Sequence, residues 1–176
     1  NQIESEGAAH FFVQKGFSSD MTPVSSVVKE DTDTVLCIIN TCSVTQKAEQ
    51  KARRIIRLVL KKYQNASVIV TGCYAQLRPE EIKKMDKRIS VLKGQLKSRL
   101  TQIPEMLEGF LKGEKWNAEK FSDLLDINLF CLPQEKTDTP ENSFLLATDS
   151  FIAHSRSSLK IQDGCNNNCS YCTIHM

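Results

Sequence analysis

Two short apolar runs, rich in β-branched residues, most strongly limit what this chain can fold into. They cover residues 34–40 (TVLCIIN) and 67–71 (SVIVT), and residues 43–63 between them read as a long helix. A nearly continuous apolar run, rather than one that alternates with polar residues, is typical of a strand buried on both faces of a parallel sheet. A strand, a helix and a second strand form a right-handed crossover when the strands are parallel. We therefore expect an α/β domain built on a parallel sheet.

Further helices and one more strand are expected around this unit. In the 43–63 helix we expect Ile55, Leu58 and Val59 to form the inward stripe. The other expected elements are a helix over 2–15 closed by Gly16, a helix over 79–87 that begins at Pro79, a strand over 89–92, and a helix over 95–112 that Pro104 divides or kinks.

The chain divides into three parts by pattern. Residues 1–115 carry the strand and helix alternation and read as one domain. Residues 116–153 read as a connector, and because residues 116–142 lack clear periodicity they could also form a peripheral hairpin. Residues 154–176 read as the beginning of a second domain, with short strands expected at 144–147 and 158–161. Neither end reads as a natural boundary, so we expect a truncated piece of a longer chain.

Composition excludes several classes of protein. Of 176 residues, 40% are hydrophobic and 25% are charged, which is ordinary for a globular protein. The net charge of +2 does not by itself indicate nucleic-acid binding, and no apolar run approaches the length of a membrane span. Seven cysteines is an odd number, and their grouping suggests metal ligands in a reducing compartment rather than disulfides. We expect a cytoplasmic protein with no membrane partner.

Three of the cysteines form a closely spaced set. Cys165, Cys169 and Cys172 have the spacing Cys-x3-Cys-x2-Cys, which suits three corners of a [4Fe-4S] cluster. Three thiolates leave the fourth iron open to a small molecule. This arrangement is typical of enzymes that cleave S-adenosylmethionine reductively to form a carbon radical. A zinc site completed by His175 is the alternative that the residues leave open.

Two other cysteines occupy matching positions in the expected sheet. Cys42 follows the first apolar run, and Cys73 follows the second after Gly72. Ligands gather at the carboxyl edge of an open α/β sheet, and helix N-termini there lower the pKa of a thiol. Gly72 would let the backbone approach a bulky ligand closely. Cys42 and Cys73 could hold part of a second cluster, or they could be simple buried thiols.

The helix expected at 43–63 is strongly basic. Its seven cations are usually explained as a solvated helix face. The functional alternative is contact with RNA phosphates, for which Lys47, Lys51 and Arg54 are favoured because they lie nearest Cys42.

The motifs together resemble the methylthiotransferase family of radical S-adenosylmethionine enzymes, which modify tRNA adenosines or a ribosomal protein. The resemblance is carried by residues 1–6 (NQIESE), 40–45 (NTCSVT), 70–76 (VTGCYAQ) and 160–172, and it covers nearly the whole chain. It implies an N-terminal parallel-sheet domain that binds an auxiliary [4Fe-4S] cluster, followed by the start of a radical S-adenosylmethionine (β/α) barrel.

The resemblance also implies particular ligands. Cys42 and Cys73 correspond to the second and third auxiliary-cluster cysteines, and the first would precede the position of Asn1. Cys165, Cys169 and Cys172 correspond to the radical-cluster ligands, and Tyr171 to an aromatic residue that contacts the adenine of S-adenosylmethionine. The implied partners are a tRNA substrate and a flavodoxin-type electron donor. Because this piece contains only the first loop of the radical domain, we do not expect it to catalyse the reaction by itself.

Residues 154–156 and 160–166 resemble the branch that acts on N6-threonylcarbamoyladenosine beside the anticodon of tRNA. The alternative substrates within the family are isopentenyladenosine in tRNA and an aspartate of a ribosomal protein. An alternative of another class is a non-catalytic α/β module that binds RNA or protein and carries a zinc site. Cys37 reads as a core residue, and no role is assigned to Cys131, His10 or His154.

Overall fold

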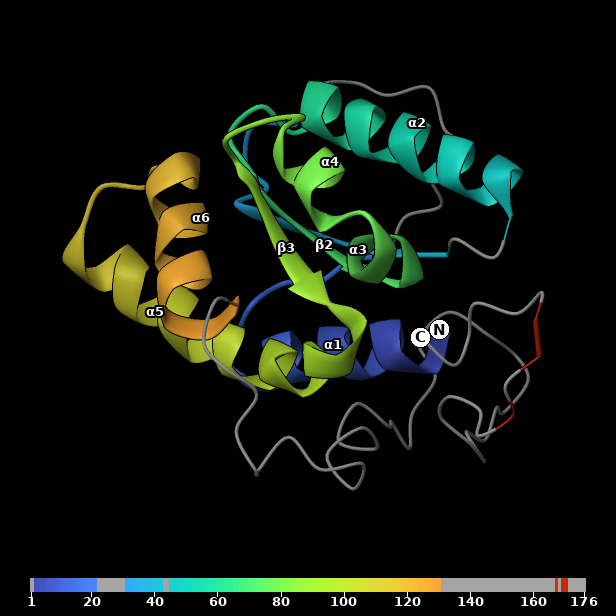
Figure 1. Cartoon of the computed structure of the whole chain (residues 1–176). Helices are drawn as coiled ribbons and strands as arrows, with labels where there is room; N and C mark the ends of the chain where they lie inside the picture. Colours follow the sequence, from blue (N-terminus) through green and yellow to red (C-terminus); the bar gives the residue numbers. More distant parts are fainter. Residues whose placement is uncertain (1, 22–30, 43–44, 131–166, 168, 171–176) are drawn as a thin grey trace.

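The computed structural model (Figure 1) describes residues 2–21, 31–42, 45–130, 167 and 169–170. Within these residues helices and strands alternate along the chain, which confirms the predicted α/β class. In chain order the elements are α1 (Gln2–Gln14), β1 (Leu36–Thr41), α2 (Gln46–Lys62), β2 (Ser67–Gly72), α3 (Cys73–Leu77), α4 (Pro79–Lys83), β3 (Ile89–Lys93), the 3-10 helix η1 (Gly94–Gln102), α5 (Ile103–Gly113), α6 (Ala118–Leu125) and the π-helical turn η2 (Asp126–Phe130).

The three strands form one parallel sheet in the order β1-β2-β3. The three strands predicted at 34–40, 67–71 and 89–92 are present, with bounds that differ from the prediction by no more than two residues. The central strand β2 is buried along its whole length, as expected for an apolar run covered on both faces. The register pairs Thr41 of β1 with Gly72 of β2, and Gly72 with Lys93 of β3, so all three strands end together.

Helices cover both faces of the sheet (Figure 1). On one face, α2, α3 and α4 enclose a core that includes Ile56, Val70 and Ile82. On the other face, α1, η1, α5, α6 and η2 enclose a core that includes Ile69 and Phe121. Because alternate residues of β2 point to opposite faces, Ile69 and Val70 belong to different cores.

The helix α2 begins at Gln46 rather than at the predicted residue 43, and of its predicted inward residues Ile55 and Val59 pack partly buried against the core. The Thr45 hydroxyl accepts a hydrogen bond from the Ala48 backbone nitrogen at 3.1 Å, so the helix begins after Thr45. Ala52 and Ile56 are its buried residues. The prediction that Leu58 faces inward is wrong, because its position on the helix turns it toward solvent and leaves it 38% exposed.

The helix predicted over residues 79–87 is shorter than expected. It ends at Lys83, and a turn follows in which the Asp86 carboxylate accepts hydrogen bonds from the backbone and the side chain of Arg88. An aspartate that bonds the backbone two residues later favours a turn over helix continuation. The division near Pro104 is confirmed, because η1 gives way to α5 at Ile103 and Pro104 lies in the first turn of α5.

The reading of residues 118–130 as an irregular connector is wrong. The Asn117 side chain accepts a hydrogen bond from the Lys120 backbone nitrogen at 2.9 Å and starts α6, whose Phe121 and Leu125 are fully buried. In the sequence, the signals for this helix are the capping residue Asn117 and these two apolar positions one helical turn apart. The division into domains at residues 115 and 153 remains a prediction.

Some predicted features lie outside the described residues. They are the strands at 144–147 and 158–161, Cys131, His154, Cys165, Tyr171, Cys172 and His175. Within the described residues, no helix is long and apolar enough to cross a membrane.

Candidate metal centre and basic helix

Two cysteines lie at the carboxyl edge of the sheet, where the sequence predicted them. Cys42 directly follows Thr41 at the end of β1, and Cys73 directly follows Gly72 and begins α3. Thr41 and Gly72 are register partners in neighbouring strands, and both cysteines are exposed with free thiols. We call Thr41, Cys42, Gly72 and Cys73 the cysteine rim.

The two strand ends of the cysteine rim are in close contact. Gly72 has a positive φ of 94°, and a Cβ atom added there would lie 2.2 Å from the carbonyl oxygen of Thr41 and 2.7 Å from Oδ1 of Asn40. The Thr41 hydroxyl donates to the Thr71 carbonyl at 2.6 Å. The space that the sequence analysis assigned to a ligand at Gly72 is therefore occupied by β1.

The first turn of α1 reaches the same region. The Asn40 side chain donates weak hydrogen bonds to Oε2 of Glu4 at 3.4 Å and to Oγ of Ser5 at 3.3 Å. Lys97 of η1 forms an ion pair with Glu4 at 2.5 Å, and both side chains are largely buried. These contacts between segments far apart in the sequence fix the start of α1 against the end of β1.

A hydrogen-bonded group of three side chains lies beside Cys73. The Tyr74 hydroxyl donates to Glu81 at 2.9 Å, and Arg53 of α2 donates to the Tyr74 hydroxyl at 3.2 Å and to Glu81 at 3.1 Å. Burial raises the pKa of the Tyr74 hydroxyl above its ordinary value, so it stays protonated and able to donate. No local sequence pattern indicates this group, since only the packing of α2 against α3 and α4 creates it.

The remaining described cysteines differ in environment. Cys37 lies within β1 and packs at the margin of the core, and burial raises the pKa of its thiol to about 12. A thiol that resists deprotonation is a poor metal ligand, which agrees with its reading as a core residue. Cys169 is exposed. Its predicted co-ligands Cys165 and Cys172 lie outside the described residues, as does Tyr171.

The donors present at the cysteine rim fit part of an iron–sulfur site. Exposed thiols on two adjacent strand ends can act as soft thiolate ligands for iron. Among the described residues, no group of three or more cysteine, histidine or carboxylate side chains is close enough to hold a metal ion. Cys42 and Cys73 could thus supply two ligands of such a site, and a complete site needs others.

The helix α2 begins at Gln46, four residues after Cys42, and carries the predicted cations on its outer face. Lys47, Lys51 and Arg54 are exposed. None of the three forms an ion pair with another described residue. Their charges are therefore available to an anionic partner.

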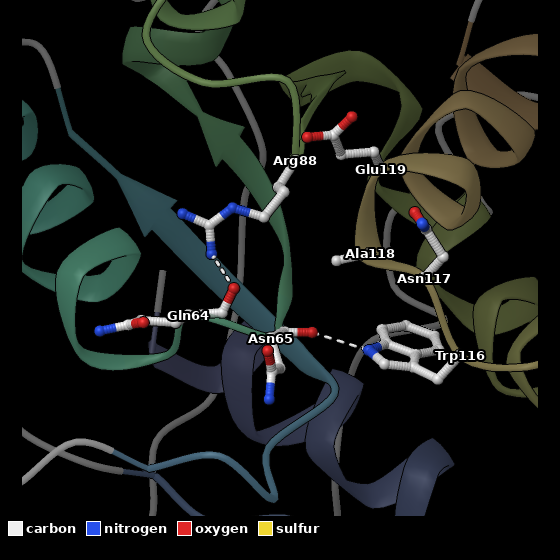
Figure 2. A pocket seen from close by; sticks show the side chains of 7 residues that line it. All are labelled: Gln64, Asn65, Arg88, Trp116, Asn117, Ala118 and Glu119. Carbon is white, nitrogen blue, oxygen red and sulfur yellow. Dashed lines mark hydrogen bonds between the residues drawn. The ribbon is translucent and has the colours of Figure 1, made fainter.

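A shallow polar hollow lies at the opposite, amino edge of the sheet (Figure 2). Its volume is about 250 Å³. The Trp116 indole nitrogen donates to the Asn65 carbonyl at 2.7 Å, and Arg88 donates to the carbonyls of Tyr63 and Gln64 at 2.9 and 2.7 Å. These polar groups are already engaged in holding the end of α2, so the hollow offers little to a ligand.

On the surface of α1, Nε2 of Gln14 lies 2.9 Å from Nε2 of His10. This agrees with the reading of His10 as a residue without a ligand role.

Comparison with known proteins connects this geometry to a family. The family described as "Uncharacterized protein family UPF0004" matches residues 1–94, which include α1, the whole sheet and both cysteines of the rim. The chain belongs to this family. The match agrees with the sequence motifs, which indicated the N-terminal domain of methylthiotransferases, and the named relatives are methylthiotransferases.

The relatives share moderate identity over most of this chain. It is 35% identical to the threonylcarbamoyladenosine tRNA methylthiotransferase MtaB of Treponema pallidum (strain Nichols), over 99% of this chain and 43% of that protein. It is 29% identical to the enzyme of the same name from Bacillus subtilis (strain 168), over 99% of this chain and 33% of that protein. It is 30% identical to the ribosomal protein uS12 methylthiotransferase RimO of Clostridium botulinum (strain Hall / ATCC 3502 / NCTC 13319 / Type A), over 85% of this chain and 30% of that protein.

The chain therefore spans less than half the length of the curated relatives it matches. No solved structure matches this chain.

Proposed function

We propose that this chain belongs to a radical S-adenosylmethionine methylthiotransferase that modifies N6-threonylcarbamoyladenosine beside the anticodon of tRNA. The observation that carries the proposal is the 35% identity to the Treponema pallidum enzyme over 99% of the chain. In support, two exposed thiols lie at the rim of a parallel sheet, and unpaired cations begin next to them on α2.

The cysteines are assigned to two [4Fe-4S] clusters. Cys42 and Cys73 are two ligands of the auxiliary cluster, and Cys165, Cys169 and Cys172 are the ligands of the radical cluster. When bound, the clusters and S-adenosylmethionine supply the radical chemistry that places a methylthio group on C2 of the adenosine. Tyr171 contacts the adenine of S-adenosylmethionine.

The protein side chains around the cysteine rim hold it in position. Gly72 allows the ends of β1 and β2 to meet, so Cys42 and Cys73 leave neighbouring strands at the same edge. Arg53, Tyr74 and Glu81 tie the start of α3 to α2. A ligand pair held by backbone pairing on one side and by side-chain hydrogen bonds on the other is preorganised, which favours cluster binding.

Lys47, Lys51 and Arg54 are assigned to tRNA phosphates. They are exposed at the end of α2 nearest Cys42, and cations in this position would hold the RNA backbone near the modified base. An electron donor of the flavodoxin type is the second proposed partner, and the cytoplasm is the proposed location.

Nucleoside analysis tests the substrate. In a strain that lacks the gene, tRNA digests analysed by mass spectrometry should lose 2-methylthio-N6-threonylcarbamoyladenosine and keep 2-methylthio-isopentenyladenosine. A plasmid carrying the intact gene should restore the missing nucleoside. Unchanged methylthio-adenosines would contradict the tRNA assignment, and loss of the isopentenyladenosine product alone would assign the protein to that branch.

A ribosomal-protein substrate is the second candidate. It is supported by the 30% identity to the Clostridium botulinum uS12 methylthiotransferase, over 85% of the chain, compared with 99% for the Treponema pallidum tRNA enzyme. The mass of ribosomal protein uS12 from the same strain distinguishes it. A uS12 that loses a methylthio group while tRNA is unchanged would favour this candidate.

The zinc-binding module is tested on the full-length protein by anaerobic reconstitution. Bound iron and sulfide with broad absorbance near ~400 nm support the clusters. One tightly bound zinc without iron would support the module.

A further inference from the structure

The cations of α2 continue beyond the three residues assigned above. Arg57 and Lys61 are also exposed, and they lie on the same outer side of the helix as Lys51 and Arg54 because residues three and four apart are neighbours on a helix surface. The opposite side of α2 is buried through Ala52 and Ile56. The full set, which we call the α2 cation row, is Lys47, Lys51, Arg54, Arg57 and Lys61.

In the part of the domain that the structure describes, several cations form ion pairs, and the members of the α2 cation row do not. Lys15 pairs with Glu105 at 2.7 Å, and Lys112 pairs with Glu108 at 2.5 Å. On α2 itself, Arg53 is engaged by Glu81 at 3.1 Å. Within the described part of the chain, no ion pair is formed by any of the five members of the row.

The geometry of the row suits a linear polyanion. Residues 47 and 61 are fourteen residues apart, so the row is about 21 Å long at the rise of an α-helix. It begins beside Cys42 and runs toward the amino edge of the sheet, because α2 returns the chain from the end of β1 to the start of β2. The one exposed large apolar side chain on α2 is Leu58, at 38%. Such a row resembles the phosphate-contacting surface of a nucleic-acid binder more than the apolar centre of a protein interface.

The row is also fixed relative to the cysteine rim. Arg53 lies on the same helix and is bonded to Tyr74, the residue after Cys73, at 3.2 Å. The guanidinium carbon of Arg53 lies 5.9 Å from the centroid of the Tyr74 ring. A displacement of α2 would break these contacts, so the row and Cys73 keep a constant separation.

We propose that the α2 cation row is a phosphate track, along which one strand of RNA runs from the cysteine rim to the amino edge of the sheet. This inference rests on the proposed tRNA substrate and extends the contact surface to Arg57 and Lys61. The near half of the track holds phosphates beside the modified base. The far half holds phosphates further along the same strand and sets the direction in which the RNA leaves the site.

The test measures tRNA binding to the full-length holoenzyme as a function of salt concentration. Neutralising phosphates releases counterions, so the logarithm of the affinity falls with the logarithm of salt by about 0.7 to 0.9 per phosphate contact. The far-half variant Arg57→Glu/Lys61→Glu should therefore lower this slope by about 1.4 to 1.8. The charge-conserving variant Arg57→Lys/Lys61→Arg should keep the slope of the parent.

The matched control is Lys115→Glu/Lys120→Glu, which makes the same charge change on the opposite face of the sheet. Both of these lysines are exposed, and Lys120 pairs only with Glu114 at 3.3 Å on the surface. The control should keep the slope of the parent, and thermal unfolding of each variant should match the parent.

If the far-half variant keeps the parent's slope of log affinity against log salt concentration, the proposed phosphate track is wrong. An equal fall in the far-half variant and the control also overturns it, because the effect would then be one of net charge. Nucleoside analysis separates this result from the proposed function. Loss of the threonylcarbamoyl product in the deletion strain with an unchanged slope would leave the function standing without the track.

Discussion

Gly72 and Thr41 meet across the ends of β2 and β1 so closely that no side chain fits between them. A Cβ atom on Gly72 would lie 2.2 Å from the carbonyl oxygen of Thr41, and Gly72 has a φ of 94°. Each residue is followed directly by a cysteine of the rim. The contact between two backbones therefore determines how near Cys42 and Cys73 can lie.

Gly72→Ala should destabilise the protein by about 2 to 4 kcal/mol, because the added methyl group meets backbone rather than a movable side chain and the φ is unfavourable for alanine. Urea unfolding measures this loss. Gly109→Ala is the control, since Gly109 lies inside α5 with no atom within 4 Å of the added Cβ. The control should gain up to about 1 kcal/mol. Equal stabilities of the two variants would contradict the close contact.

Removing either rim thiol should remove one of two clusters. After anaerobic reconstitution of the full-length protein, Cys42→Ser and Cys73→Ser should each retain about half of the iron of the parent, since a serine hydroxyl is a poor substitute for thiolate. Iron and sulfide analysis makes the measurement. Cys37→Ala is the control and should retain all of the iron, because Cys37 lies within β1 away from the rim. Full iron in both serine variants would contradict the rim site.

The thiol of Cys37 should make stability fall at alkaline pH. Burial raises its pKa from 9.0 to about 12, so above pH 9 the unfolded state loses a proton that the folded state keeps. Stability then decreases as pH rises through this window, by about 1.4 kcal/mol for each pH unit between the two values. Urea unfolding at pH 8 and pH 10 measures the slope. Cys37→Val should lose less stability than the parent over this range, and an equal loss would contradict the raised pKa.

The Tyr74 hydroxyl should contribute to stability through Glu81 and Arg53. Tyr74→Phe removes the bonds of 2.9 and 3.2 Å while keeping the ring, and it should cost about 0.5 to 1.5 kcal/mol. Thermal unfolding measures the change. An equally stable Tyr74→Phe would show that the three side chains do not hold α2 to α3.

A chain of buried hydroxyls should hold α6 to the sheet. Ser122 donates to the Arg88 carbonyl at 2.6 Å, and so it accepts from Ser67 at 2.7 Å. Ser122→Ala removes the bond of the buried Ser67 hydroxyl and one of the two bonds that the Arg88 carbonyl accepts, and it should cost about 1 to 3 kcal/mol. Urea unfolding measures the cost, and the exposed Ser18→Ala should leave stability unchanged. A neutral Ser122→Ala would contradict the role of this chain of hydroxyls.

The sequence by itself determined the features that depend on local pattern. Apolar β-branched runs placed β1 and β2, and the residues that follow them placed Cys42 and Cys73 at one edge of the sheet. Gly16 at the end of α1 and Thr45 at the start of α2 act through their own backbone and side chain, so they too could be read from the sequence. The predicted radical-cluster ligands other than Cys169 lie outside the described residues.

Only the tertiary structure decided which neighbours these residues have. Arg53 and Arg54 are adjacent and chemically identical, yet Arg53 is bound by Tyr74 and Glu81 whereas Arg54 faces outward. Likewise, Gly72 makes room for β1 and not for a ligand. Such differences arise from contacts between segments far apart in the chain, and a local pattern carries no information about the partner that packing brings to it.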